Sequence, residues 1–222
     1  MLKVAILAGG LGTRLGELTR NVPKPMIEIG GRPYLERVVE SFAKRGLRDI
    51  VMLTGYLSEV IERHFGEGSR FGITVAYRRE SEPLGTGGAI RDARDLLGDR
   101  FLMTFGDVYR EFDYDRFVRE HHEPATAVYP RRTAGNMEVE GNLVTRYDKR
   151  APELPYIDAG FSHMPAETID LLPASGPCSF EEIVFPRLIA ERKLTCEIVD
   201  VNFCDIGTPD ELERTRVMLE RS

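Results

Sequence analysis

The sequence predicts an α/β fold in which a mostly parallel β-sheet is flanked by helices. Short apolar runs typical of buried strands alternate with stretches whose apolar residues recur at helical spacing. Each helical stretch spans about ten residues, which is enough to return the chain to the start of a neighbouring parallel strand. Because strand and helix alternate in this way, right-handed crossovers are favoured, and we expect the sheet to be Rossmann-like.

The predicted elements of the first half have recognisable ends. Pro33 opens the first helix, Gly46 ends it, and Gly66 ends the second helix. Ligands of such sheets bind at the carboxyl ends of the strands, so the loops that follow the strands are the first candidates for a site. The predicted strands cover residues 4–7, 50–53, 73–77 and 101–105.

The second half of the chain is patterned differently. Residues 130–156 are polar and contain two turn signals, which predicts β-hairpins that cover the site. Residues 194–203 are expected to form one last strand, and Ser179 to start a helix that Pro186 kinks or ends after its first turn. We expect one domain, residues 1–222, with a first part over residues 1–129, a cover over residues 130–165 and a return to the core over residues 166–222.

Composition limits the classes of partner. The formal charge of −6 disfavours nucleic acid as the main partner, because proteins that bind the phosphate backbone usually carry a basic surplus. No apolar run approaches the length that spans a membrane, and the N-terminus shows no signal-sequence pattern, so we expect a cytoplasmic protein. The cysteines have no metal-binding spacing and are expected to pack as small apolar side chains.

A glycine-rich loop directly follows the first predicted strand. Gly9, Gly10 and Gly12 leave backbone N–H groups open to a ligand, and Arg14 and Lys24 add positive charge. Clustered N–H groups and cations attract anions, so we interpret the loop as a cradle for a triphosphate. Its spacing fits neither the dinucleotide-binding pattern nor the Walker loop. For this loop taken alone, a tight turn without a ligand stays open as the alternative.

A second glycine-rich turn, residues 82–88, precedes the helix that follows the third strand. It belongs to the same edge of the predicted sheet as the first loop. Its compact backbone would form one wall of a flat pocket for a base, with Pro83 and Leu84 as apolar surface. The alternative is a helix N-terminus that Thr86 caps, without a ligand.

Two aspartates follow buried strands and are candidates for a metal site. Asp107 comes directly after the fourth strand, and Asp205 follows the last one. A pair of carboxylates at strand ends suits one Mg²⁺, which prefers oxygen ligands and substrate phosphates. Each aspartate alone is more often a turn or cap residue, and Asp205 precedes a helix that Thr208 and Glu211 start as a capping box.

Taken together, these blocks resemble the sugar-1-phosphate nucleotidyltransferase family. The resemblance covers nearly the whole chain and keeps the family's order. It implies an enzyme that condenses a nucleoside triphosphate with a sugar 1-phosphate, giving a nucleoside diphosphate sugar and pyrophosphate with Mg²⁺ as cofactor, beneath a small β-rich sugar-binding cover. The blocks are residues 7–15, 23–25, 82–88, 106–107, 158–161 and 205–209.

The resemblance leaves the subtype open. Residues 82–88 and 179–182 look most like heptose-1-phosphate guanylyltransferases, whereas residues 23–31 look equally like cytidylyltransferases. A uridylyl- or thymidylyltransferase, or a transferase for a non-sugar phosphate, is a further alternative. A non-catalytic nucleotide-sensing module is a remote one, because both candidate metal aspartates and the cations of the first loop are present. The base, the sugar and the oligomeric state, a homodimer included, stay open.

The resemblance also implies roles for individual residues. Arg14, Lys24 and Asp107 would be catalytic, with Arg14 on the β- and γ-phosphates and Lys24 on the phosphate that reacts. Asp107 and Asp205 would hold Mg²⁺, and Asp158 stands where many members have asparagine. The nucleotide would be bound by Leu7, Ala8, Gly9, Gly10, Gly12, Thr13, Arg14, Glu82, Pro83 and Gly87, and the sugar phosphate by Lys149, Asp158 and Gly160.

This reaction needs no general base, because an oxygen of a sugar 1-phosphate is already an anionic nucleophile. The difficulty is to bring two polyanions together and to stabilise the charge that develops on the leaving pyrophosphate. Arg14, Lys24, Lys149 and Mg²⁺ would do so by positioning and electrostatics. The expected partners are therefore a nucleoside triphosphate and a sugar 1-phosphate, with no nucleic acid and no membrane.

Overall fold

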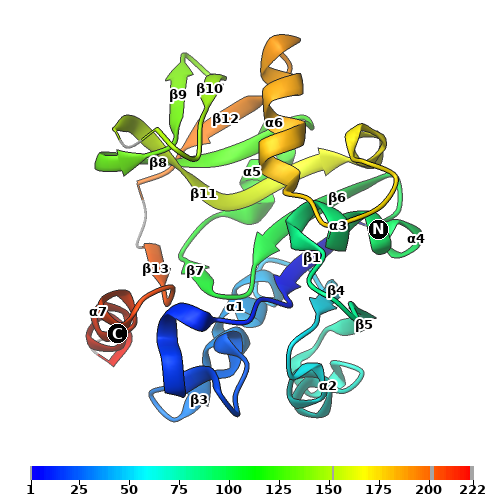
Figure 1. Ribbon diagram of the computed structural model, residues 1–222, viewed down its shortest axis with the longest axis vertical. Coiled ribbons are helices and arrows are strands. Elements are labelled where there is room, and N and C mark those ends of the chain that lie inside the picture. The colour runs from blue at the N-terminus through cyan, green and yellow to red at the C-terminus, as the bar shows by residue number, and fades with distance from the viewer. Residues whose placement is uncertain (1, 152, 201–202, 221–222) are drawn as a thin grey trace.

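The computed structural model describes residues 2–151, 153–200 and 203–220. Within these ranges, nine strands form one central sheet in the order β5-β4-β1-β6-β11-β8-β12-β10-β9 (Figure 1). The first four strands in this order are parallel, as expected from the alternation of strand and helix. They are β1 (Lys3–Ala8), β4 (Asp49–Thr54), β5 (Thr74–Arg79) and β6 (Arg100–Phe105).

The rest of the sheet is mixed. Strand β11 joins the two halves, because it pairs antiparallel with both β6 and β8. Strand β12 is parallel to β8, whereas β10 is antiparallel to β12 and forms with β9 a hairpin of the kind predicted within residues 130–156. The α/β fold class is confirmed, with parallel pairing concentrated in the first half. These strands are β8 (Ala125–Gly135), β9 (Met137–Glu140), β10 (Leu143–Tyr147), β11 (Leu154–Pro165) and β12 (Thr195–Ile198).

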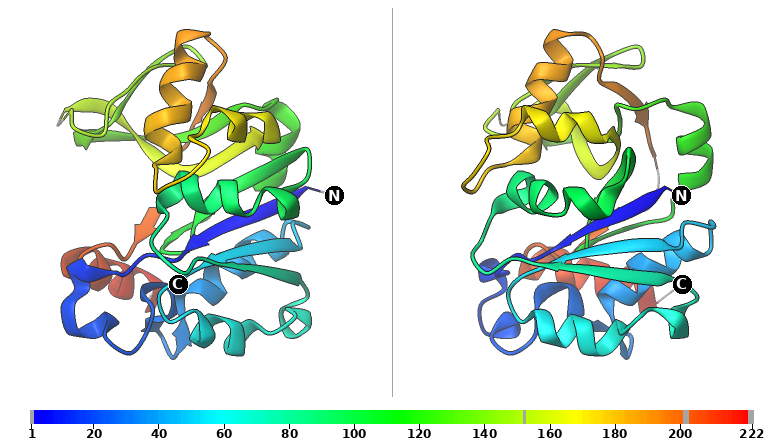
Figure 2. Two further views of the ribbon diagram at one scale, coloured as in Figure 1. Left: turned by 45° about the vertical axis from the view of Figure 1, so that its right-hand side comes forward. Right: turned by 90° about the vertical axis from the view of Figure 1, so that its right-hand side faces the viewer.

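Helices cover both faces of the sheet (Figure 2). Val4 and Ile6 of β1 pack toward the face covered by α1, α2, α5 and α7, whereas Ala5 packs toward α3, α4 and α6. The alternation follows from the two-residue period of a strand, and it explains why β1 is buried on both sides. The helices are α1 (Tyr34–Ala43), α2 (Ser58–Phe65), α3 (Gly85–Asp92), α4 (Arg94–Leu97), α5 (Tyr114–Glu120), α6 (Phe180–Ala190) and α7 (Pro209–Glu220).

Short elements complete the described chain. Two ribbons of two strands stand apart from the central sheet. Short 3₁₀ helices of three to seven residues occur in the connections. The ribbons pair β2 (Glu28–Ile29) with β3 (Arg32–Pro33), and β7 (Val108–Arg110) with β13 (Phe203–Asp205); the 3₁₀ helices are η1 (Thr13–Thr19), η2 (Lys24–Met26), η3 (Ser69–Phe71) and η4 (Ala166–Leu171).

The prediction of one last strand was wrong, and of the two outcomes predicted at Pro186, a kink or an end of the helix, the second was wrong. The single strand predicted over residues 194–203 is divided into β12, which stays in the central sheet, and β13, which leaves it to pair with β7; residues 201–202 lie outside the described ranges. Pro186 does not end α6, which continues to Ala190. Burial of Phe185 and Leu188 on either side of the proline holds the helix together despite the missing N–H donor.

Among the described residues, the helices are too short or too polar to cross a lipid bilayer.

Candidate active site

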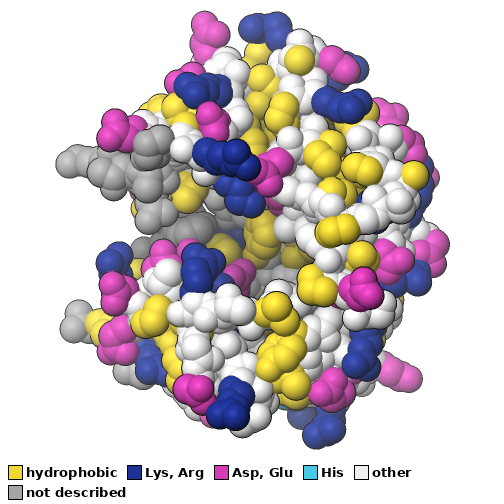
Figure 3. Space-filling view, in the orientation of Figure 1, with side chains coloured by type: hydrophobic (Ala, Val, Ile, Leu, Met, Phe, Trp, Pro, Cys, Tyr) yellow, Lys and Arg dark blue, Asp and Glu magenta, His cyan; other side chains and the backbone are white. Residues whose placement is uncertain are grey.

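A cavity of about 470 Å³ lies where the carboxyl ends of β1 and β6 meet the loops after β1 and β5. In the space-filling view the surface is hollowed at mid-height, with lysine and arginine side chains at the rim (Figure 3). The cavity therefore lies at the edge of the sheet where the sequence placed the site. The predicted site residues that line it are Leu7, Ala8, Gly9, Gly10, Gly12, Thr13, Arg14, Lys24, Pro83 and Asp107.

The first glycine-rich loop is held by contacts that only glycine permits. Gly12 has a φ of 64°, and a Cβ there would lie 2.9 Å from Cγ2 of Thr19 and 3.1 Å from Cβ of Lys24. The hydroxyl of Thr19 donates to the carbonyl of Gly12 at 3.2 Å and so fixes the turn into η1. Arg14 is exposed at the start of η1 and lines the cavity. The loop presents backbone and the Arg14 cation to the cavity, as a polyanion site requires.

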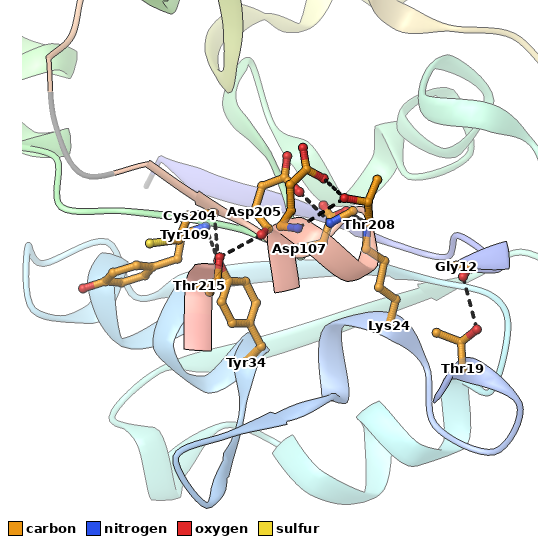
Figure 4. A network of polar contacts seen from close by, with 12 residues as sticks. Gly12, Thr19, Lys24, Tyr34, Asp107, Tyr109, Cys204, Asp205, Thr208 and Thr215 are labelled. Carbon is orange, nitrogen blue, oxygen red and sulfur yellow. Dashed lines mark hydrogen bonds and ion pairs between the residues drawn. The ribbon is translucent and has the colours of Figure 1, made fainter. Parts of the chain in front are cut away.

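Lys24 and Asp107 form an ion pair beside this loop (Figure 4). The Lys24 side chain is only 9% exposed and that of Asp107 is 27% exposed, so little water competes for either charge. Lys24 opens η2, and Asp107 lies between β6 and β7, so the pair connects elements far apart in sequence. The sequence resemblance named both residues, but their pairing comes from the tertiary structure.

Asp205 lies across the ribbon from Asp107 and has an unusual environment. Its Oδ1 accepts a hydrogen bond from the N–H of Gly207 at 2.5 Å. Burial, together with the charges of Glu211 and Asp107, raises its pKa to about 6, although that hydrogen bond lowers it. Such crowding of carboxylates fits a hard divalent cation, which would relieve the repulsion and takes oxygen ligands. Among the described residues no three acidic, histidine or cysteine side chains cluster as a ready-made cage, so water, and phosphate oxygens once a substrate is bound, would complete the shell.

The second glycine-rich turn supplies the opposite wall of the cavity. A Cβ on Gly85 would lie 2.5 Å from the carbonyl oxygen of Cys178, and the N–H of Gly87 donates to the same oxygen at 2.9 Å. Glycine is therefore needed here for close approach to a neighbouring loop, and Gly87 itself is buried away from the cavity. Thr86 does not cap α3. Its hydroxyl donates to Oε2 of Glu181 at 2.7 Å and accepts from the N–H of Phe180 at 2.8 Å.

Glu80 is a cavity residue that the sequence reasoning missed. Glu82, which the resemblance assigned to the base pocket, is exposed and lines only a neighbouring surface hollow, whereas Glu80 lines both. A Cβ on Gly9 would lie 2.5 Å from Oε1 of Glu80, and the N–H of Leu84 donates to Oε2 at 3.0 Å. Burial raises the pKa of the Glu80 carboxyl. Glu80 directly follows β5, but the predicted strand ended at residue 77, so the signal that singled out Asp107 was not visible for Glu80.

The predicted sugar-phosphate residues lie on the mixed half of the sheet and do not line the main cavity. Asp158 and Gly160 are in β11, where the pairing with β8 shifts register between Asp158 and Ser162. Gly160 has a φ of 68°, and its N–H donates to Oδ1 of Asp158 at 2.9 Å. Lys149 is exposed, with its Nζ 3.8 Å from Oε2 of Glu182. Their contact with a sugar phosphate stays a prediction.

A fully buried arginine adjoins this region, and no sequence pattern indicated it. Arg110 donates from Nη2 to the carbonyl of Gly160 at 3.0 Å and lies 3.4 Å from the hydroxyl of Thr104. Its Nε has no hydrogen-bond partner among the described residues. A lone arginine in a short strand resembles a surface residue in sequence, so its burial is decided by the packing of β7 against β11.

Residues 3–141 match the family described as "Nucleotidyl transferase". The mannose-1-phosphate guanylyltransferase of Mycobacterium tuberculosis is 32% identical over an alignment of 231 residues that covers 97% of this chain and 64% of the relative, so the chain spans less than two thirds of that protein. The D-glycero-alpha-D-manno-heptose 1-phosphate guanylyltransferase of Campylobacter jejuni is 27% identical over 215 residues, 95% of this chain and 96% of the relative.

Comparison with solved structures also finds a nucleotide-binding relative with the same fold. The crystal structure of HddC from Yersinia pseudotuberculosis has a TM-score of 0.85 and 27% identity, and the comparison covers 99% of this chain and 100% of that one. A second crystal structure has HddC complexed with GMP-PN, with a TM-score of 0.82. With a family match over more than half of its length and a glycine-rich anion loop at the expected edge of the sheet, this chain belongs to the nucleotidyl transferase family.

Proposed function

We propose that this protein transfers the guanylyl group of GTP to a sugar 1-phosphate, giving a GDP-sugar and pyrophosphate. The observation that carries the choice of GTP is the carboxylate of Glu80, which lies in the cavity next to the glycine-rich loop. The two curated relatives described above are named guanylyltransferases, which supports the same base.

Guanine is the base whose pairing edge matches a carboxylate. It presents the N1–H and N2–H₂ donors side by side, and a carboxylate with two acceptor oxygens takes both. Uracil and thymine present one N–H between two carbonyl oxygens, which a carboxylate repels. Cytosine and adenine present one amino group beside a ring nitrogen that is itself an acceptor. Since Glu80 already accepts from the N–H of Leu84, its orientation is fixed before a base arrives.

The acceptor we propose first is a heptose 1-phosphate of the manno configuration, with mannose 1-phosphate as the second candidate. The names of the relatives share the manno configuration, so the same ring stereochemistry would face the enzyme in both cases. Asp158 and Gly160 in β11 would contact the sugar, and Lys149 would bind its phosphate. The charge of Arg110 beside Asp158 would help to hold that carboxyl in place.

The proposed reaction is an in-line displacement at the α-phosphate of GTP. Arg14 and the glycine-rich loop would bind the β- and γ-phosphates, and Lys24 would contact the phosphate that reacts. Asp107 and Asp205 would hold Mg²⁺, which when bound neutralises phosphate charge and the departing pyrophosphate. Before substrates bind, the ion pair with Asp107 keeps the Lys24 ammonium at the cavity instead of in solvent. No side chain needs to remove a proton, because the acceptor phosphate is already anionic.

A matrix of substrates tests this proposal. GTP, UTP, CTP, dTTP and ATP are each assayed with heptose 1-phosphate, mannose 1-phosphate and glucose 1-phosphate, by the release of pyrophosphate in the presence of Mg²⁺. We expect GTP with a manno-configured acceptor to give the highest kcat/KM. A higher kcat/KM with UTP, CTP or dTTP would contradict the assignment of the base. No release with any pair, together with tight nucleotide binding, would support the sensing-module alternative instead.

A further inference from the structure

One tyrosine hydroxyl connects the two strands that carry both candidate metal aspartates (Figure 4). Tyr34, the first residue of α1, is fully buried. Its hydroxyl donates to the carbonyl of Cys204 at 2.8 Å and accepts from the N–H of Tyr109 at 3.0 Å. Cys204 and Tyr109 are directly opposite each other in the ribbon of β13 and β7, so the hydroxyl bridges a paired position.

The pairing of its own two strands does not fix this ribbon in place, so its position depends on contacts with the elements around it. It has only two strands, separate from the central sheet, and the strands are far apart in sequence. An isolated pair of strands is marginally stable in water. Asp107 lies one residue before β7, and Asp205 is the last residue of β13. The separation of the two carboxylates therefore depends on how the ribbon is pinned from outside.

Two further contacts pin the same ribbon beside the tyrosine. The hydroxyl of Thr215 in α7 donates to the carbonyl of Asp205 at 2.8 Å, and the N–H of Ile206 donates to the carbonyl of Asp107 at 3.3 Å. The tyrosine contact differs from these because it binds both strands through one atom. Burial raises the pKa of Tyr34 well above its usual value, so its hydroxyl stays a neutral donor.

We propose that Tyr34 is a positioning residue, whose hydroxyl fixes the spacing of Asp107 and Asp205 and thereby the affinity of the site for a divalent cation. The proposal rests on the metal role of the two aspartates in the proposed function. Tyr34 touches neither the cation nor the substrates. It acts through the backbone of Tyr109 and Cys204, as groups that orient metal ligands commonly do.

The test compares Tyr34→Phe with Tyr77→Phe by direct Mn²⁺ binding. Tyr77 of β5 is the control, because its hydroxyl also donates to a backbone carbonyl, that of Gly66, at 2.7 Å, and this contact lies outside the ribbon. Free Mn²⁺ is measured by electron paramagnetic resonance without substrates, so the readout does not depend on turnover. We expect Tyr34→Phe to weaken Mn²⁺ binding about tenfold or more, the scale of losing an orienting group, and Tyr77→Phe to leave it unchanged. In the activity assay, Tyr34→Phe should need more Mg²⁺ and recover kcat at saturating Mg²⁺.

Three results would overturn the proposal: unchanged Mn²⁺ affinity in a folded Tyr34→Phe variant, equal weakening in both variants, or no Mn²⁺ binding by the wild-type chain. Failure of the proposed function is a separate result, because it shows as absent pyrophosphate release in the substrate matrix while Mn²⁺ binding persists.

If Tyr34→Phe does not fold, hydrogen exchange in the wild-type chain tests the proposal instead. Coupling between the bridge and the cation is reciprocal, so Mg²⁺ should slow exchange of the Tyr109 amide. An amide that exchanges at the same rate with and without Mg²⁺ would contradict the proposal.

Discussion

The parallel and mixed halves of the sheet contribute to the candidate site in different ways. In the parallel half, the cavity is lined by loops that directly follow β1, β5 and β6. In the mixed half, the predicted sugar residues Asp158 and Gly160 lie within β11, at an irregularity in its pairing with β8. The candidate residues of the parallel half follow the ends of strands, whereas those of the mixed half lie at a register shift within a strand.

This difference follows from topology. Parallel strands joined by crossovers bring all their carboxyl ends to one edge, so residues after those strands converge whatever their distance in sequence. In an antiparallel strand, a side chain is brought to the surface of the site by a local shift of register, which re-aims it. Gly160, with its φ of 68°, permits that shift, and its carbonyl accepts from the hydroxyl of Thr104 at 2.9 Å and from Arg110 at 3.0 Å.

The largest expected effect tests the parallel half. Lys24→Ala removes a buried cation from the cavity and leaves Asp107 without its ion-pair partner. We expect kcat for pyrophosphate release to fall about a hundredfold or more, the scale of one contact to developing charge. Lys193→Ala is the control, because Lys193 is exposed and pairs only with Glu191 at the surface. Near-wild-type turnover in the Lys24 variant would break the assignment of the phosphate site.

A second prediction separates two glutamates of the same loop. Glu80→Gln replaces one acceptor oxygen of the cavity carboxylate by a donor, whereas Glu82→Gln makes the same change at an exposed position. We expect the preference for GTP over ITP, which lacks the N2 amino group, to shrink about 10- to 100-fold in the Glu80 variant, or about 1–3 kcal/mol. The ratio of kcat/KM values for the two nucleotides measures it. A larger loss of the preference for GTP in the Glu82 variant would indicate that Glu82, the residue named by the resemblance, contacts the base.

A third prediction concerns the contact between the halves. Thr86→Val removes the hydrogen bonds that join the loop of the parallel half to Glu181 and Phe180 at the start of α6. Glu181 is only 4% exposed, so the lost bond is not fully replaced by water. We expect Tm to fall by about 2–8 °C, the scale of about 1–2 kcal/mol in a chain of this size. The exposed Thr145→Val is the matched control, and an equal fall in both would remove any special role for the Thr86 contact.

The smallest expected effect tests the mixed half through pH. Burial, together with the charge of Glu181, raises the pKa of Asp158 to about 7. The folded state therefore binds a proton that the unfolded state releases near pH 4, so this group's contribution to stability is lost as pH rises from about 4 to 7. Asp158→Asn should remove that loss and raise Tm by about 2–4 °C at pH 8, with less effect at pH 5. Thermal unfolding of the variant and the wild-type chain at both pH values measures the difference in Tm. An equal difference at pH 5 and pH 8 would show that ionisation of Asp158 is not its cause.

The sequence by itself determined the parallel half and its cavity residues. Local signals sufficed there: an apolar run, a glycine-rich turn, and the position of Asp107 directly after a strand. Glu80 was overlooked because the strand before it was predicted to end at residue 77, whereas β5 continues to Arg79. Once the order of strands and helices is known, the convergence of these loops follows from the geometry of crossovers.

Only the tertiary structure decided the contacts made by residues without a local pattern. The ion pair of Lys24 with Asp107, the burial of Arg110, and the bridge from Tyr34 to the ribbon all join segments distant in sequence. The division of the last strand into β12 and β13 belongs with them, because leaving the central sheet brings Asp205 beside Asp107. Side-chain periodicity reports which residues are buried, but partners far apart in sequence are chosen by packing and by the need to satisfy buried polar groups.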